Sequence, residues 1–192
     1  QREAAQDATG SLMVTEVGGI TSRGKLARLA KGQHNGRTIE TNKDAFIRDL
    51  VESWPEESTI IWCVYNDEQD RMAQVFPDAA SITGDTKYED RLRLIAEFQS
   101  GRRKVLISKP KILGFGLNLQ VATRQVFSGL QDSYEQFYQA VKRSNRYGST
   151  KPLNVHIPVT ELEEPMIETV LRKAKRVEED TREQERMFRD AK

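Results

Sequence analysis

The sequence is poor in the residues from which metal and thiol sites are built. Among 192 residues there is one cysteine, Cys63, and two histidines, His34 and His156. A single cysteine forms no disulfide within the chain, so a reducing compartment such as the cytoplasm is expected. Cys63 stands in an apolar run and is predicted to be a buried small hydrophobe. The histidines have no Cys or His neighbours at ligand spacing, so no metal site is predicted.

Long apolar runs and a large net charge are also missing. No stretch approaches the about 20 apolar residues of a membrane span, and no signal-peptide pattern opens the chain, so no membrane partner is expected. The formal net charge is only +1, which says nothing about partners. Its distribution is more informative, because residues 101–151 contain ten Lys and Arg against Asp132 and Glu135 alone, a local net charge of +8. Such a segment is typical of a phosphate-facing surface.

The chain divides into three predicted parts. Residues 1–40 are small, polar and punctuated by glycine, and irregular or helical structure is expected there. Residues 41–160 contain most of the apolar pattern and are predicted to form the main domain. Residues 161–192 are highly charged and predict a C-terminal helical extension with one apolar stripe: Leu162, Met166, Val170, Ala174 and Val177. A chain that opens at Gln1 without Met is expected to be a piece of a longer protein.

In the main domain, helical and strand patterns alternate. A continuous apolar run at 59–65 is typical of a strand buried on both faces. The predicted strands are 59–65, 79–83, 104–108, 124–128 and 153–159, and the predicted helices are 41–54, 67–74, 87–99 and 133–143. This alternation predicts the α/β class, with an open, mainly parallel sheet flanked by helices. Ligands of such sheets bind beyond the carboxyl ends of the strands, so the loop at 109–120 is predicted to be functional.

Two stretches carry the residues suited to phosphate. The loop contains Gly114 and Gly116, where backbone can approach a ligand closely. In the predicted helix that follows, Gln139, Arg143 and Arg146 recur at spacings of four and three and would share one face. Guanidinium groups present fixed donors that match phosphate oxygens. Taken alone, the glycine pair is also compatible with an ordinary turn, and the arginines with a solvated basic face.

Together, these stretches resemble the C-terminal RecA-like lobe of superfamily 2 helicases, most closely the Swi/Snf-like DNA translocases. The letters GFGLNL at 114–119 resemble motif V of that family, and QAVKRSNRYGSTKP at 139–152 resemble motif VI. The apolar strand at 59–65 resembles motif IV. The resemblance covers roughly residues 58–159 and implies a RecA-like sheet.

The resemblance assigns a nucleotide to one set of residues. Arg143 and Arg146 would be arginine fingers that reach ATP held by a separate N-terminal RecA-like lobe. Gln139 would order the γ-phosphate region or the attacking water. Gly114, Gly116 and Asn118 would border the nucleotide. ATP with Mg²⁺ is therefore expected only in the two-lobe protein, and this chain alone is predicted to bind no cofactor and to be inactive.

The resemblance assigns nucleic acid to a second set. The phosphate backbone of DNA, which is expected to be double-stranded, would be contacted by two loops that follow predicted strands. These contacts would be Thr83, Gly84, Ser108, Lys109 and Lys111. Strand separation and simple translocation both remain open, as does the direction of movement.

Two alternatives compete with this interpretation. Residues 19–25 match G-x-x-x-x-G-K, which would make the chain a self-sufficient P-loop ATPase using Lys25 and Asp67. Leu26, however, stands where that motif needs Ser or Thr for the metal. The second alternative is a non-enzymatic nucleic-acid-binding module that uses only the basic segment.

Overall fold

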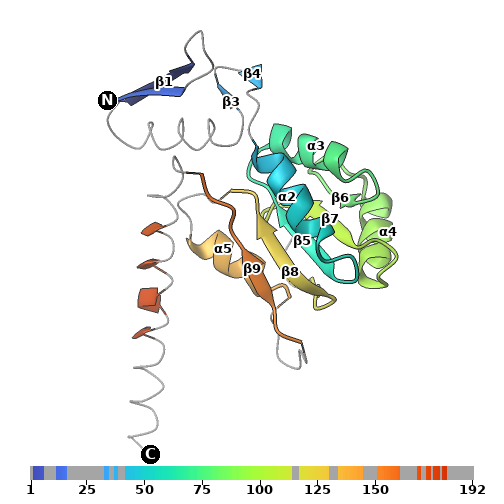
Figure 1. Cartoon of the computed structure of the whole chain (residues 1–192). Coiled ribbons are helices and arrows are strands. Elements are labelled where there is room, and N and C mark those ends of the chain that lie inside the picture. Colours follow the sequence, from blue (N-terminus) through green and yellow to red (C-terminus); the bar gives the residue numbers. More distant parts are fainter. Residues whose placement is uncertain are drawn as a thin grey trace, which may run out of the picture.

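The computed structural model describes residues 2–6, 12–16, 33–34, 37–38, 42–113, 117–129, 134–144 and 151–160, with helical stretches at 168–169, 172–173, 175–177 and 179–180. Figure 1 colours the helices and strands along the sequence. The centre of the molecule is a parallel sheet of five strands in the order β6-β7-β5-β8-β9. The strands are β5 (Ser58–Trp62), β6 (Ala80–Ser81), β7 (Val105–Ser108), β8 (Ala122–Phe127) and β9 (Asn154–His156). The predicted α/β class and parallel sheet are confirmed.

The central strand β5 is buried along its whole length, as its apolar run predicted. Ile60 and Trp62 point to one face of the sheet, and Ile61 and Cys63 to the other, because successive side chains in a strand alternate. Each face therefore supports its own apolar layer, and a strand between two layers needs no polar side.

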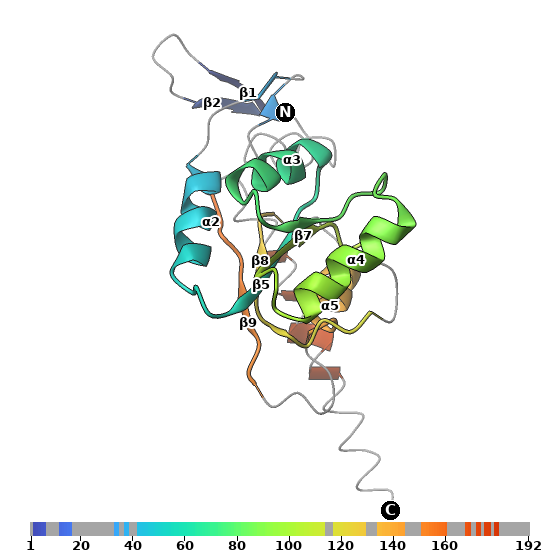
Figure 2. The same ribbon diagram turned by 90° about the vertical axis from the view of Figure 1, so that its right-hand side faces the viewer.

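Four helices of the described part of the chain cover the two faces. The helices are α2 (Lys43–Glu52), α3 (Asn66–Val75), α4 (Tyr88–Gln99) and α5 (Tyr134–Val141). One face packs against α2 and α3 through Ile47 and Met72, and the other against α4 and α5 through Phe98 and Ala140. Figure 2 shows α2 and α4 on opposite sides of the strands. This layered arrangement is the usual one for a parallel sheet.

The connection between β7 and β8 has a feature that decides where the site residues lie. These two strands run parallel, so residues 109–121 start at the carboxyl end of β7 and must return to the amino end of β8. The two described ends of this connection consequently lie at opposite ends of the sheet.

The two terminal regions differ from each other. The N-terminal part was predicted to be irregular or helical. Where the structure describes it, it instead forms two antiparallel pairs, β1 (Arg2–Gln6) with β2 (Leu12–Glu16) and β3 (Gln33–His34) with β4 (Arg37–Thr38). The β1 letters REAAQ favour helix locally, and pairing with a distant segment overrides such a preference. The described residues between 168 and 180 are helical. Within the described residues, no helix is long and apolar enough to cross a membrane.

Candidate functional site

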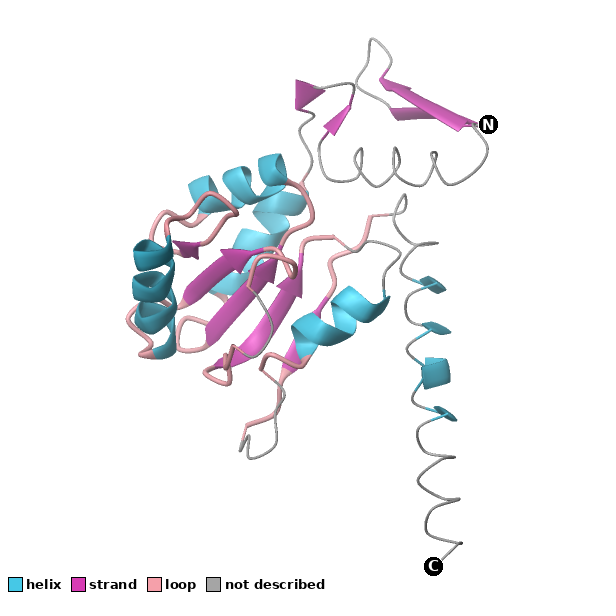
Figure 3. Ribbon diagram, turned by 180° about the vertical axis from the view of Figure 1, so that it is seen from behind, coloured by secondary structure: helices cyan, strands magenta, loops and turns pink. Residues whose placement is uncertain are grey.

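Four of the five predicted nucleic-acid contacts gather at the carboxyl ends of β6 and β7. We call Thr83, Gly84, Lys109 and Lys111 the strand-end patch. The loops that carry them touch, since a Cβ on Gly84 would lie 3.5 Å from Cδ1 of Ile112. Figure 3 shows the neighbouring strands whose ends carry these loops. The patch is therefore formed by two loops that the sequence separates by about 25 residues and that parallel pairing brings together.

Within the strand-end patch, the side chains differ in exposure. Lys111 and Gly84 are exposed, whereas Thr83 and Lys109 are half-buried. The Thr83 amide donates to Oγ1 of Thr86 at 2.9 Å, which closes a tight turn before α4. The Lys109 ammonium donates to the side chain of Asn66 at the start of α3. Lys111 is thus the cation of the patch that is open to solvent.

Ser108, the fifth predicted contact, is a correction. It is fully buried, and its hydroxyl donates to the Ile82 carbonyl at 2.8 Å. A buried hydroxyl that already bonds to backbone presents nothing to a phosphate in solvent. Ser108 therefore joins the ends of β6 and β7 and supports the patch from below.

Gln69 provides a second support, which the sequence analysis missed. This residue of α3 is fully buried, and its Nε2 donates to the carbonyls of Ile82 at 2.9 Å and Ile107 at 3.3 Å. One side chain thereby spans two neighbouring strand ends. The only sequence signal was a glutamine on the inward face of a predicted helix, which is too common to indicate such a role.

Glu68, which stands next to Asp67 in the first turn of α3, has a structural role. One of its oxygens accepts hydrogen bonds from the amides of Val64 at 2.7 Å and Tyr65 at 3.2 Å. The other accepts a hydrogen bond from the Ser128 hydroxyl at 2.8 Å. Glu68 is buried and closes the first turn of α3. Asp67, which the P-loop alternative needs, stands exposed in the same first turn, where an acid also favours the helix dipole. Lys25 lies outside the described residues.

The predicted nucleotide residues that the structure describes lie elsewhere, around the end of α5. We call Asn118, Gln139 and Arg143 the helix-end patch. The Leu119 amide donates to the Arg143 carbonyl at 3.0 Å, and Gln99 at the end of α4 donates to the Asn118 carbonyl at 2.6 Å. The ends of the two motifs are therefore in direct contact. Gly114, Gly116 and Arg146 lie outside the described residues.

The backbone at Arg143 corrects one prediction. The predicted helix extended to Arg143, but α5 ends at Val141, and the Arg143 amide bonds back to the Ala140 carbonyl at 3.2 Å, a tighter three-residue step. Gln139 therefore lies on α5 and Arg143 lies beyond its end, so helical spacing does not place the two on one face. Arg143 is 6% exposed, and Gln139 is half-buried.

The position of the helix-end patch is a second correction. The whole loop at 109–120 was expected beyond the carboxyl ends of the strands. Only its first half lies there, because Asn118 leads into the amino end of β8. A crossover between parallel strands leaves the carboxyl end of one strand and must reach the amino end of the next, at the opposite edge of the sheet. The two patches are consequently separate parts of the surface rather than one loop site.

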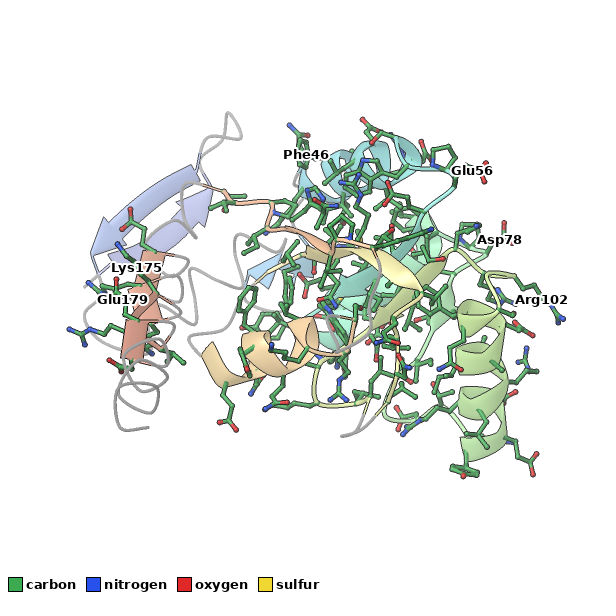
Figure 4. All side chains as sticks on the ribbon, turned by 90° about the horizontal axis from the view of Figure 1, so that it is seen from below. Phe46, Glu56, Asp78, Arg102, Lys175 and Glu179 are labelled. Carbon is green, nitrogen blue, oxygen red and sulfur yellow. The ribbon has the colours of Figure 1, made fainter. Side chains whose placement is uncertain are left out.

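The +8 segment does not form a single surface either. Residues 102–104 and Arg124 lie near the amino ends of β7 and β8. There Arg103 binds Glu97 at 2.6 Å, and Arg124 binds Glu57 at 2.9 Å. Figure 4 labels Glu56, Asp78 and Arg102 in the loops of this edge. Folding has therefore divided the basic stretch among three regions and paired part of it with acids.

Arg124 also contacts His156, the last residue of β9, whose pKa is perturbed. The Arg124 guanidinium lies 4.4 Å from the Trp54 ring centre and 3.2 Å from Nε2 of His156. Partial burial, together with the charge of Arg124, lowers the pKa of His156. Hydrogen bonds from Arg124 and Thr123 lower the pKa of Glu57. This cluster fastens β8 to the loop before β5.

Cys63 and the possible metal ligands are the other groups whose reactivity was predicted. Burial raises the pKa of the Cys63 thiol well above its usual value, and the prediction of a buried small hydrophobe is confirmed. Among the described residues, no group of three or more His, Cys, Asp or Glu side chains is placed to hold a metal ion.

Comparison with known proteins places this geometry in context. The model of the helicase conserved C-terminal domain matches residues 42–148. The chain is 27% identical over 104 residues to an ATP-dependent RNA helicase FAL1 of Kluyveromyces lactis, covering 52% of this chain and 26% of that protein. It is 28% identical over 104 residues to eukaryotic initiation factor 4A of Dictyostelium discoideum, covering 52% and 25%. The chain thus spans about a quarter of the length of the curated relatives it matches.

Solved structures show the same fold. The C-terminal part of the Fun30 ATPase domain aligns with a TM-score of 0.61 at 22% identity, over 72% of this chain and 48% of that one. Dbp5 of S. cerevisiae, bound to RNA and ADP BeF3, aligns with a TM-score of 0.59 at 19% identity, over 68% and 35%. Identities this low establish the arrangement of helices and strands and no more.

Proposed function

Since this chain belongs to the helicase conserved C-terminal domain family, we propose that it is the second motor lobe of an ATP-dependent helicase or translocase. In this proposal, the helix-end patch faces a nucleotide held by an N-terminal RecA-like lobe. The strand-end patch contacts the backbone of a nucleic acid. The lobe supplies half of an ATPase site, so it hydrolyses no ATP by itself.

One contact supports the proposal most directly, the 3.0 Å hydrogen bond from Leu119 to the Arg143 carbonyl. It joins the end of the segment that resembles motif V to the segment that resembles motif VI. A change in one of these segments therefore shifts the other. Because residues 109–113 connect the strand-end patch to the first of these segments along the chain, the crossover at 109–121 would link the nucleic acid to the nucleotide.

The chemistry requires cations that arrive with lobe closure. Phosphoryl transfer spreads negative charge over the equatorial oxygens, and an arginine supplied across an interface accelerates it by about 10³ to 10⁵. Arg143 is 6% exposed in the lobe by itself. The proposal therefore requires that closure of the other lobe on the turn at 142–144 brings its guanidinium to the nucleotide. Hydrolysis then depends on lobe movement, which moves the bound strand.

The test uses the full-length motor that contains this lobe. Arg143→Ala and Arg146→Ala are each expected to lower kcat for nucleic-acid-stimulated ATP hydrolysis by about 10³ or more, with nucleic-acid binding retained. The matched control is Arg93→Ala, an exposed arginine on α4 that binds Asp90 and Glu97 and lies outside both patches. An arginine whose removal leaves stimulated hydrolysis at the control level is not a finger.

For the nucleic acid, we propose double-stranded DNA and a Swi/Snf-like motor, on the motif V and motif VI letters. RNA is the second candidate, because the curated relatives include proteins named as ATP-dependent RNA helicases. ATPase assays with duplex DNA and single-stranded RNA of equal length separate the two. Greater stimulation by RNA would replace DNA as the proposed substrate and leave the motor role intact.

A further inference from the structure

A buried glutamine in the sheet holds the turn that carries Arg143. Gln125 of β8 is fully buried between the sheet and α5. Its Oε1 accepts the Trp62 indole N–H at 3.0 Å, and its Nε2 donates to the Ala140 carbonyl at 3.2 Å and to the Ser144 hydroxyl at 2.9 Å. One amide thus joins β5, β8 and both sides of the turn.

The chemistry of the site makes this arrangement specific. Ala140 and Ser144 flank Arg143, and the Arg143 amide bonds to the same Ala140 carbonyl that Gln125 binds. Leaving a buried polar group without a partner is unfavourable, so the turn has one strongly favoured position relative to the sheet. An apolar side chain of similar size would fill the volume of Gln125 and leave that position unspecified.

We propose that Gln125 is a positioning residue for nucleotide hydrolysis, which orients the turn at 142–144 so that Arg143 meets the nucleotide on lobe closure. This inference rests on the proposed function of Arg143. Gln125 is buried in the sheet and acts through the turn. Its loss therefore lowers the rate of the chemical step more than the binding of either ligand.

Gln69 offers a matched control within the same lobe. Both glutamines are fully buried, and both donate through Nε2 to main-chain carbonyls. Gln69, however, holds the strand ends beneath the strand-end patch, whereas Gln125 holds the helix-end patch. The same substitution at the two positions removes similar bonds from the two sites.

The experiment compares Gln125→Met and Gln69→Met in the full-length motor. Gln125→Met is expected to lower kcat at saturating ATP and nucleic acid by about tenfold to a hundredfold, because a shift of about 1 Å in a catalytic group has that effect. The nucleic-acid concentration for half-maximal stimulation should change less than about twofold. Gln69→Met is expected to raise that concentration by about tenfold and to change kcat less than about threefold.

Two further variants test whether a fall in kcat results from the lost bonds to the turn rather than from a general loss of folding. Gln125→Glu keeps the size of the side chain and the acceptor for Trp62 but loses both donors to the turn, so it should reproduce the fall in kcat. Ser144→Ala removes a single bond and should lower kcat by about threefold. Thermal unfolding of all four variants shows whether their stabilities are comparable.

The results distinguish a failure of the positioning role of Gln125 from a failure of the proposed function of Arg143. Equal effects of Gln125→Met and Gln69→Met on both parameters, or an unchanged kcat in Gln125→Glu and Ser144→Ala, would overturn the positioning role. If Arg143→Ala itself leaves hydrolysis unchanged, the proposed function of Arg143 fails instead. A fall in kcat for the Gln125 variants together with Arg143→Ala supports both.

Discussion

The strand-end patch and the helix-end patch differ in how they meet solvent. The first lies on loops at the carboxyl ends of β6 and β7, and its Lys111 is exposed in the lobe by itself. The second lies around the end of α5, where Arg143 is 6% exposed. A phosphate backbone can therefore meet the first patch directly, whereas the second is expected to act only against another lobe. This difference agrees with the proposed two-lobe motor.

The two patches are alike in the buried residue that lies beneath each of them. Each patch stands on a buried glutamine that donates to main-chain carbonyls, Gln69 on one side and Gln125 on the other. Buried, satisfied polar groups specify one geometry where an apolar contact would allow several. The backbone is thus held in the same way beneath both patches, so the different ligands proposed for them depend on the side chains above these glutamines.

The largest effect is expected at the helix-end patch. Arg143→Lys keeps the charge but loses the planar donors of guanidinium, so kcat for stimulated ATP hydrolysis should fall by about 10² or more. Nucleic-acid affinity in the absence of ATP should remain within about twofold. Steady-state ATPase and equilibrium binding assays measure the two quantities. Loss of both together would mean that the patches do not act separately.

The next effect is expected at the strand-end patch. Lys111→Ala removes an exposed cation, so affinity for duplex DNA at physiological salt should fall by about tenfold. The slope of log K against log salt should fall by about one, because one phosphate contact is lost. Binding titrations at several salt concentrations give both values. An unchanged slope would remove Lys111 from the contact surface.

A smaller effect is expected beneath that patch. Ser108→Ala breaks the buried bond to the Ile82 carbonyl and should lower the free energy of unfolding by about 1 kcal/mol. For a protein of this size that corresponds to a fall of about 2–4 °C in Tm. Because Ser108 is a support, the salt slope should equal that of the unaltered protein. A lower slope would restore Ser108 as a phosphate contact.

The smallest effect concerns His156 of β9, which is a member of neither patch. The pKa of His156 is lowered in the folded state, so the unfolded chain binds more protons below about pH 6.5. Stability contributed by neutral His156 is present above that pH and is lost as the pH falls through the lower folded pKa. Urea unfolding at pH 5 and pH 7.5 measures the difference, which His156→Gln should reduce. A larger pH dependence in that variant would reverse the assigned sign.

Much of the fold could be predicted because its signals are local. The apolar run of β5, the period of α4 and the glycine at Gly101 that follows it each report on neighbouring residues. Gly101 has a φ of 72°, a conformation in which glycine is favoured, and this matches the predicted end of the helix. The predicted helices and strands of the main domain were therefore found close to their positions.

The errors share one cause, which is dependence on distant partners. The strands at 2–6 and 12–16 exist through pairing with each other, and β1 alone favours helix. Ser108 looked accessible because its burial depends on the neighbouring strand β6. The basic segment looked like one surface because sequence position does not show that parallel strands send its parts to opposite edges.

The amino-acid sequence by itself determined the class of this lobe and the chemical types gathered in its two motifs, because apolar periodicity and guanidinium chemistry are properties of the residues themselves. Tertiary structure alone decided that the two ends of the 109–121 crossover lie apart, that Gln69 and Gln125 became supports, and that Arg143 is shielded. The physical reason is that each connection in a parallel sheet must run from the carboxyl edge back to the amino edge, and that burial exists only once distant segments have packed.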